Sequence, residues 1–148
     1  MLGHEEQTRK VYEDEREVEE LVRGFESFAT PPQGFGHAEH LTVALWYLAR
    51  LPEPEAAERM RGGLRKFAAH HGSNLYHETI TLFWLRVVAA FLRREGRGRA
   101  PHELANLLAA SYADKRLVFD YYSPRLIETN EAKSSWVEPD LKPFDFEG

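Results

Sequence analysis

Apolar residues recur every three or four positions through most of this chain, in runs separated by proline and glycine. This spacing gathers the apolar side chains on one face of an α-helix, where they can be buried against a core. No segment alternates apolar and polar residues for long enough to predict a β-strand. The sequence therefore predicts an all-α fold. The main helices are expected at residues 9–28, 37–50, 54–71, 76–95 and 101–112, and shorter helical stretches at 114–122 and 124–133.

Short breaks join the first four expected helices, and those at 31–34 and 51–54 contain prolines that a helix cannot accommodate in its interior. Short connections favour antiparallel neighbours, so we expect an antiparallel bundle of four main helices with one or two short C-terminal helices. The helix at 76–95 is the most apolar and is expected at the centre. The pair Gly62-Gly63 either weakens its helix or lets a neighbouring element approach closely.

The length of 148 residues fits a single domain. We expect residues 1–148 to form one helical domain, with a frayed N-terminus at 1–8 and an irregular C-terminal tail at 134–148 that packs on the bundle. The tail carries apolar side chains that can anchor it there, namely Trp136, Leu141 and Phe144.

The composition excludes several classes of function. The net charge is −5 and no basic face is evident, which argues against nucleic acid as a partner. The chain has no cysteine, so it has no disulfide, thiolate metal site or cysteine nucleophile. No apolar run approaches the roughly 20 residues that span a bilayer, and the charged N-terminus lacks the apolar centre of a signal peptide. The sequence predicts a cytoplasmic protein without a membrane partner.

Five of the seven histidines are expected at one end of the bundle. Antiparallel packing brings the end of the helix at 54–71 to the same side as the starts of the helices at 37–50 and 76–95. His4 and His102 lie outside this set. The five are His37, His40, His70, His71 and His77.

His37, His40 and His77 are the predicted metal ligands. His37 and His40 are three residues apart and are neighbours on one helix surface, while His77 continues the apolar stripe of its own helix. Inward histidines on facing helices are how helix bundles bind metals. Three neutral imidazoles suit a divalent metal such as Zn, Fe or Mn, and no organic cofactor is predicted. The alternative for any one of these histidines is that it caps its helix or hydrogen-bonds a loop carbonyl.

Other side chains are expected near the same end. Glu78 is the predicted acid/base residue, because it follows His77 and points about 100° away from it around the helix. Glu26 and Glu39 are further candidate carboxylates. His71 is a candidate fourth ligand, and Thr81 is a candidate hydrogen-bonding partner for a bound molecule.

Three functions fit this set of residues. The first is a metal-dependent enzyme acting on a small molecule, for which the sequence does not distinguish a hydrolase from an oxidoreductase. The second is a metal-free pocket that binds a small molecule or uses His77 and Glu78 as acid/base groups. The third is an interaction or scaffolding protein, in which the histidines are structural and the aromatic tail binds a partner or forms a homodimer.

Two motifs resemble those of a group of small bacterial proteins of unknown function. They are His37-x-x-His40-Leu41 and Tyr76-His77-Glu78-Thr79-x-Thr81, and the segment 137–141 adds to the similarity. The resemblance covers most of the chain, and it implies no reaction because that group has no assigned activity. In architecture the expected bundle is also similar to metal-binding four-helix bundles of the DinB type, which use three histidines. Here, in contrast to those bundles, both members of the close histidine pair lie early in the second helix.

Overall fold

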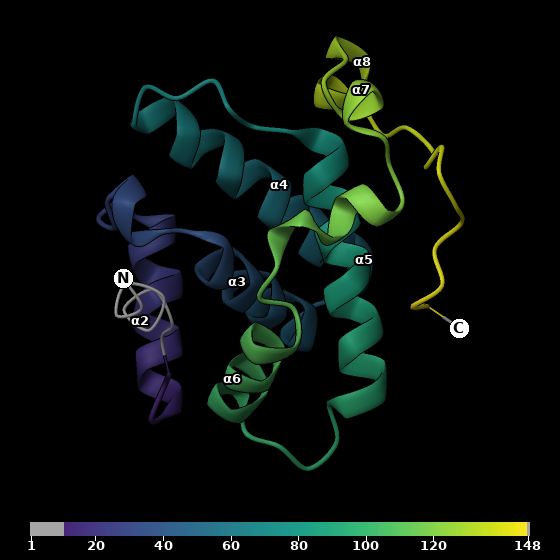
Figure 1. The fold of residues 1–148 in the computed structure, drawn as a ribbon. Helices are drawn as coiled ribbons and strands as arrows, with labels where there is room; N and C mark the ends of the chain where they lie inside the picture. Colours follow the sequence, from purple (N-terminus) through teal and green to yellow (C-terminus); the bar gives the residue numbers. More distant parts are fainter. Residues whose placement is uncertain (1–10, 148) are drawn as a thin grey trace, which may run out of the picture.

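The computed structural model describes residues 11–147, and every regular element in that range is helical (Figure 1). The all-α prediction is confirmed for these residues, and none of their helices is long and apolar enough to cross a membrane. The frayed terminus predicted at 1–8 lies outside the described residues. The α-helices are α2 (Glu15–Glu26), α3 (His37–Arg50), α4 (Glu53–His70), α5 (Glu78–Glu95), α6 (Pro101–Ser111), α7 (Pro124–Ile127) and α8 (Asn130–Ser134), and two 3-10 turns span Pro32–Gly34 and Lys115–Asp120.

Local capping explains where the helices differ from the expected ranges. Asp14 has an extended backbone and its side chain accepts a hydrogen bond from the Glu17 amide, so α2 begins at Glu15. The same helix ends at Glu26, before Phe28, whose φ of 67° lies in the left-handed region. The helical stretch predicted at 124–133 is two helices, because the Thr129 hydroxyl caps a new helix by accepting from the Ala132 amide.

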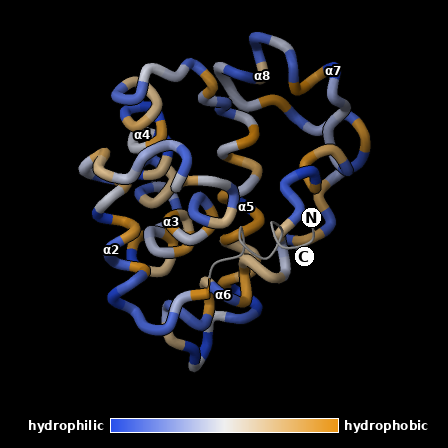
Figure 2. Tube along the Cα trace, turned by 60° about the vertical axis from the view of Figure 1, so that its left-hand side comes forward, coloured by the Kyte–Doolittle hydropathy of each residue, from blue (hydrophilic) through white to orange (hydrophobic). Residues whose placement is uncertain are grey.

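The central helix is α3, and not the helix at 76–95 that the sequence places at the centre. It packs against α2, α4, α5 and α6, and residues 41–45 are all buried, so this stretch has no solvent face. The hydropathy colouring shows the contrast between the apolar stretches of α5 and the hydrophilic outer turns of the molecule (Figure 2). The regular bundle of four main helices is not confirmed, since α3 is enclosed by four neighbours.

Three phenylalanine rings in contact connect α2, the turn before α3 and α4. The rings of Phe25 and Phe35 lie 4.8 Å apart, and that of Phe67 lies 5.5 Å from the first and 5.2 Å from the second. A Cβ atom at Gly63 would lie 2.8 Å from Cε2 of Phe25, whereas one at Gly62 would meet nothing within 4 Å. Gly63 is therefore the position at which a neighbour approaches closely.

A second apolar cluster attaches the C-terminal part of the chain to α5. Phe83 and Val87 of α5 pack against Tyr122, and the tail adds Trp136 and Phe144 to this cluster. These tail side chains pack against the cluster. The anchoring role predicted for Leu141 is wrong, because that side chain is 53% exposed; Phe144 and Phe146 occupy the cluster.

The two glycines of α4 provide a test of the packing. We expect Gly62→Ala to raise the free energy of unfolding by up to about 1 kcal/mol, because alanine favours a helix and the added methyl meets no neighbour. Gly63→Ala is expected to lower the free energy of unfolding by about 1 kcal/mol or more, because the methyl collides with the buried ring of Phe25. Urea denaturation of the two variants measures both changes, and equal stabilisation by both would contradict the close approach.

Candidate functional site

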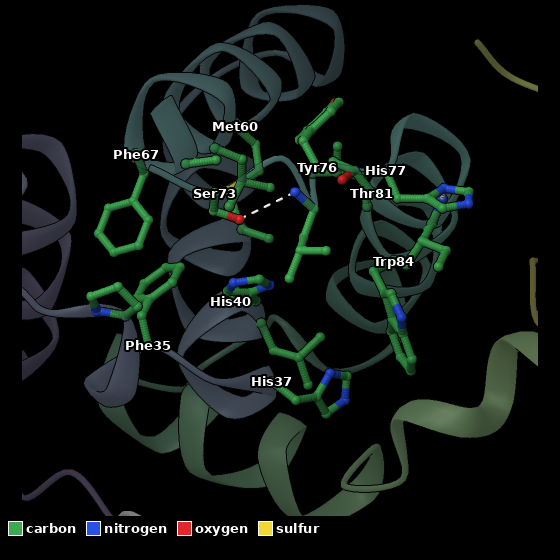
Figure 3. Close-up of a pocket in the computed structure, with 18 of the residues that line it drawn as sticks. Phe35, His37, His40, Met60, Phe67, Ser73, Tyr76, His77, Thr81 and Trp84 are labelled. Atoms are coloured by element: carbon green, nitrogen blue, oxygen red, sulfur yellow. Dashed lines mark hydrogen bonds between the residues drawn. The ribbon is translucent and has the colours of Figure 1, made fainter. Parts of the chain in front are cut away.

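A cavity of about 380 Å³ lies between α3, α4, α5 and the segment 71–77 (Figure 3). It is at the end of the molecule where α3 and α5 begin and α4 ends, and Figure 1 shows α4 and α5 diverging toward the segment that joins them. The cavity reaches the surface at this segment, where the lining residue Leu75 is 84% exposed. The side chains that form most of the wall are apolar, among them Phe35, Leu41, Met60, Phe67, Ile80 and Trp84.

Four histidines from three parts of the chain line this cavity: His37, His40, His71 and His77. The structure thus brings together residues that are forty positions apart in the sequence, as the chain direction predicts. Thr81 also lines the cavity. The fifth histidine of the expected set, His70, is exposed and stacks on Phe28, with the ring centroids 4.7 Å apart.

His77 is fully engaged in hydrogen bonds within the protein. It is the N-cap of α5, with an extended backbone, and its Nδ1 accepts from the Ile80 amide at 3.2 Å. Its Nε2 lies 2.8 Å from the carbonyl oxygen of Ile127, which can only accept, so Nε2 is the donor. Both ring nitrogens are used, and no lone pair is left for a metal or a substrate. His77 therefore caps its helix and hydrogen-bonds a backbone carbonyl, which was the alternative to its predicted role as a metal ligand.

His37 has one ring nitrogen engaged and one free. Its Nε2 lies 2.8 Å from the carbonyl oxygen of Tyr112, at the end of α6. That oxygen can only accept, so the ring carries its proton on Nε2 and presents a lone pair at Nδ1. The ring meets Trp84 edge-on, with the centroids 4.6 Å apart. Burial lowers the pKa of His37, and the bond to Tyr112 only partly opposes this, so the imidazole is neutral at pH 7.

The rings of His40 and His71 lie beside the phenylalanines. His40 packs on Phe35 at 4.6 Å, and His71 packs on Phe67 at 4.5 Å. His40 lines the cavity and is exposed to solvent, although many protein atoms surround its ring. Loss of water around the ring lowers the pKa of His40, and so does its neighbour His37. Nε2 of His71 is buried and has no hydrogen-bond partner among residues 11–147.

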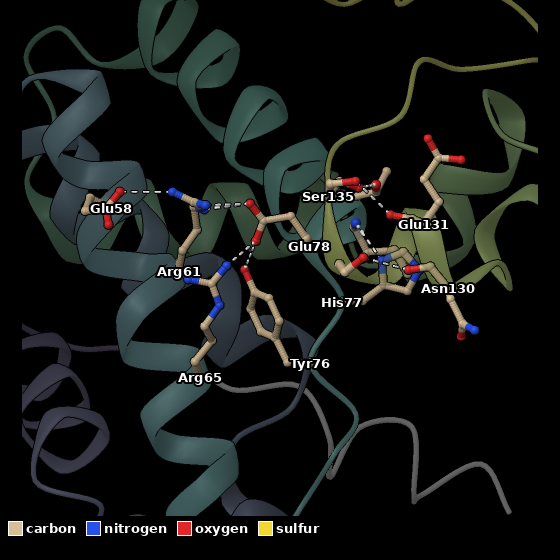
Figure 4. Close-up of polar contacts among 12 residues, drawn as sticks. Glu58, Arg61, Arg65, Tyr76, His77, Glu78, Asn130, Glu131 and Ser135 are labelled. Atoms are coloured by element: carbon tan, nitrogen blue, oxygen red, sulfur yellow. Dashed lines mark hydrogen bonds and ion pairs between the residues drawn. The ribbon is translucent and has the colours of Figure 1, made fainter.

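Glu78 lies outside the cavity, and its buried carboxylate meets two partly exposed arginines and a tyrosine (Figure 4). Its carboxylate accepts from Nε of Arg61 at 2.8 Å, from Arg65 at 2.9 Å and from the Tyr76 hydroxyl at 2.5 Å. Burial alone would raise the pKa of Glu78, but the hydrogen bonds from Tyr76 and Arg61 outweigh it and the pKa is lowered. The carboxylate is therefore ionised and occupied, so its predicted acid/base role would require this cluster to open.

The other candidate carboxylates are also engaged away from the cavity. Glu26 accepts from the Tyr47 hydroxyl at 2.6 Å and lies 3.7 Å from Arg59. Glu39 accepts from the Gly36 amide at 2.9 Å and so caps α3. Neither residue lines the cavity.

The predicted metal site does not fit this arrangement of side chains. His77 has no free nitrogen, and Glu26 and Glu78 are bound elsewhere. Within residues 11–147, no three His, Asp or Glu side chains are placed to hold one ion together. Binding of Zn, Fe or Mn by His37, His40 and His77 stays a prediction, and it would require His77 to release Ile80 or Ile127.

No match for this chain is found among known protein families, curated proteins or solved structures. The resemblance to the group of small bacterial proteins therefore stays a prediction. The roles of the motif residues follow from their contacts alone.

These contacts show that the motif around His77 is a junction between helices. Glu78 binds Arg61 and Arg65 of α4, and the Tyr76 ring lies beneath the Arg65 guanidinium. His77 binds the end of α7. Thr79 is buried, donates to the Ser135 carbonyl at 2.8 Å and accepts from the Val137 amide at 3.3 Å. Consecutive residues thus hold α5 to three separate parts of the chain.

Sequence reasoning missed the partners of this junction. Arg61 and Arg65 are one helical turn apart on α4, and this spacing signals a shared face without indicating which carboxylate they bind. The Tyr112 carbonyl and the ring of Trp84, which orient His37, carry no local signal because their roles depend on packing.

Removal of the Glu78 charge tests the junction. We expect Glu78→Gln to lower the free energy of unfolding at pH 7 by about 2 kcal/mol, because two arginines lose a hydrogen-bonded, buried counter-charge. The folded pKa is depressed, so this stabilisation is present above the ordinary glutamate pKa and is lost as the pH falls from about 4 through the folded value. The difference between the variant and the wild type should therefore shrink in acid, which urea denaturation at several pH values measures.

Glu19→Gln is the matched control for this substitution. It removes an exposed i,i+4 ion pair with Arg23 and should change the free energy of unfolding by less than about 0.5 kcal/mol. A loss at Glu78 no larger than that at Glu19 would contradict the structural role of the cluster.

Proposed function

We propose that this protein binds a small, largely apolar molecule in the cavity between α3, α4 and α5, without a metal ion. The observation that carries the proposal is the cavity itself, about 380 Å³ with mostly apolar walls and with imidazole nitrogens that have no partner among residues 11–147. Small-molecule sites are typically concave, mainly apolar and supplied with a few polar groups that orient the ligand.

The aromatic walls support an aromatic ligand. Phe35 stacks on Phe25, and Phe67 packs at a tilt against both rings. Trp84 lies on the α5 side of the cavity. Rings fixed in this way offer flat surfaces on which another ring can stack, and aromatic pairs add to the stabilisation that comes from burial. A planar ligand would replace water on these surfaces at little cost in side-chain entropy.

The hydrogen-bond partners of the histidines favour binding of a small molecule over coordination of a metal ion. His37 has one nitrogen occupied, His77 has both occupied, and the carboxylates expected beside them are bound elsewhere. The nitrogens of His40 have no hydrogen-bond partner among residues 11–147, and the buried Nε2 of His71 also has none. A polar group of a ligand would satisfy these atoms, and for the buried Nε2 of His71 it would remove the cost of burial without a partner.

Filling the cavity from one wall tests this function. Isothermal titration calorimetry with 2-naphthol and 2-methoxynaphthalene, both uncharged at pH 7, should detect binding of at least one of them. Ala68 lines the cavity, so Ala68→Phe should weaken that binding at least tenfold by occupying the space. The exposed neighbour Ala69 does not line the cavity, and Ala69→Phe should leave the affinity unchanged.

Circular dichroism and thermal unfolding establish that both variants are folded before the titrations are compared. If neither naphthalene derivative bound, or if both variants lost the same affinity, the proposed function would be refuted. Added Zn²⁺, Fe²⁺ or Mn²⁺ should not raise the thermal stability of the wild-type protein, and a clear rise would favour the metal site instead.

A further inference from the structure

We infer that the cavity selects uncharged ligands that carry a hydrogen-bond donor, and that Nδ1 of His37 accepts this hydrogen bond. The inference rests on the proposed function and specifies the class of ligand for the same cavity. It depends on three features of the cavity: the absence of charged side chains in its wall, the capped helix ends beside it and the fixed proton on His37.

No Asp, Glu, Lys or Arg of the described range 11–147 lines the cavity. Its titratable side chains are histidines and Tyr76, and the surroundings disfavour a positive charge on His37 and His40. An ionic ligand would lose its hydration and find no counter-charge in the wall, which is costly in apolar surroundings. An uncharged ligand avoids this cost.

The two helix N-termini at the cavity do not replace a counter-charge. Helix N-termini attract anions because their first amides are unpaired and the helix dipole is positive there. Here α3 has Glu39 in its first turn and α5 has Glu78, and each carboxylate offsets the dipole of its helix. The Gly36 and Ile80 amides already have side-chain acceptors.

The hydrogen bond from His37 to Tyr112 fixes which nitrogen of the His37 ring donates and which accepts. Because the Tyr112 carbonyl takes the proton on Nε2, Nδ1 has only a lone pair, and no group of residues 11–147 donates to it. Figure 3 shows one nitrogen of the His37 ring turned toward the interior of the cavity, where the edge contact with Trp84 holds the ring. The complementary group on a ligand is therefore an O–H or N–H.

Four naphthalenes of similar size separate these requirements in titrations of the full chain at pH 7. They are 2-naphthol, 2-methoxynaphthalene, 2-naphthoate and 2-naphthylmethylammonium. We expect 2-naphthol to bind about tenfold more tightly than the methoxy compound, because only 2-naphthol can donate a hydrogen bond to Nδ1 of His37. Both charged compounds should bind at least tenfold more weakly than 2-naphthol.

The outcomes distinguish this inference from the proposed function. Equal affinity for 2-naphthol and 2-methoxynaphthalene would overturn the inference and leave the proposed function standing. Tighter binding of the anion or the cation would overturn the selection of uncharged ligands. Absence of binding by all four compounds would refute the proposed function itself.

His37→Gln tests the accepting atom directly. The glutamine amide N–H reaches the position of Nε2 and can still donate to the Tyr112 carbonyl, while the acceptor at Nδ1 is lost. The variant should largely abolish the tenfold preference for 2-naphthol over 2-methoxynaphthalene, whatever the lost ring costs both ligands alike. His70→Gln, which replaces an exposed histidine outside the lining, should change neither affinity.

The nitrogen resonances of the wild-type histidines provide a readout that does not depend on the stability of a variant. NMR of ¹⁵N-labelled protein should show His37 with its proton on Nε2, and 2-naphthol should shift its Nδ1 resonance whereas 2-methoxynaphthalene should not. A proton on Nδ1, or equal shifts with both compounds, would overturn the inference.

Discussion

The buried carboxylate of Glu78 determines where α5 starts relative to α4. It is 4% exposed, and its oxygens are shared among Arg61, Arg65 and Tyr76. Arg61 lies at the middle of α4, so α5 begins beside the middle of that helix and not beside its end. The last turns of α4 extend past α5, and the segment 71–77 has to return across the intervening space. The cavity lies beside this segment, between α3, α4 and α5.

The neighbours of Glu78 in the sequence attach α5 to later parts of the chain. His77 holds the end of α7 through the Ile127 carbonyl, and Thr79 holds the tail through Ser135 and Val137. Each of these groups is buried or partly buried and has its hydrogen-bonding capacity met by a separate element, as stable interiors require. A motif whose histidine and glutamate suggest catalysis therefore has a sufficient explanation in the joining of helices.

Apolar walls and neutral histidines reinforce each other in the cavity. Loss of hydration lowers the pKa of His37 and His40, and the resulting neutral rings add no charge that would draw water or counter-ions inside. Both rings can still form directional hydrogen bonds. Such a site distinguishes ligands by shape and hydrogen bonding, with no contribution from net charge.

The sequence predicted the helical segments and their order, because apolar periodicity and prolines are local properties, and its short connections indicated the end of the molecule where four histidines line one cavity. It did not determine that α3 is central, that His77 caps a helix or that Glu78 binds two arginines. These outcomes depend on which residues of α4, α6, α7 and the tail lie opposite each side chain. A histidine or glutamate has the same spacing in the sequence whether its polar atoms are free or satisfied. Only tertiary packing decides that question, because the partners are set by the relative shift of helices and a difference of one turn exchanges them.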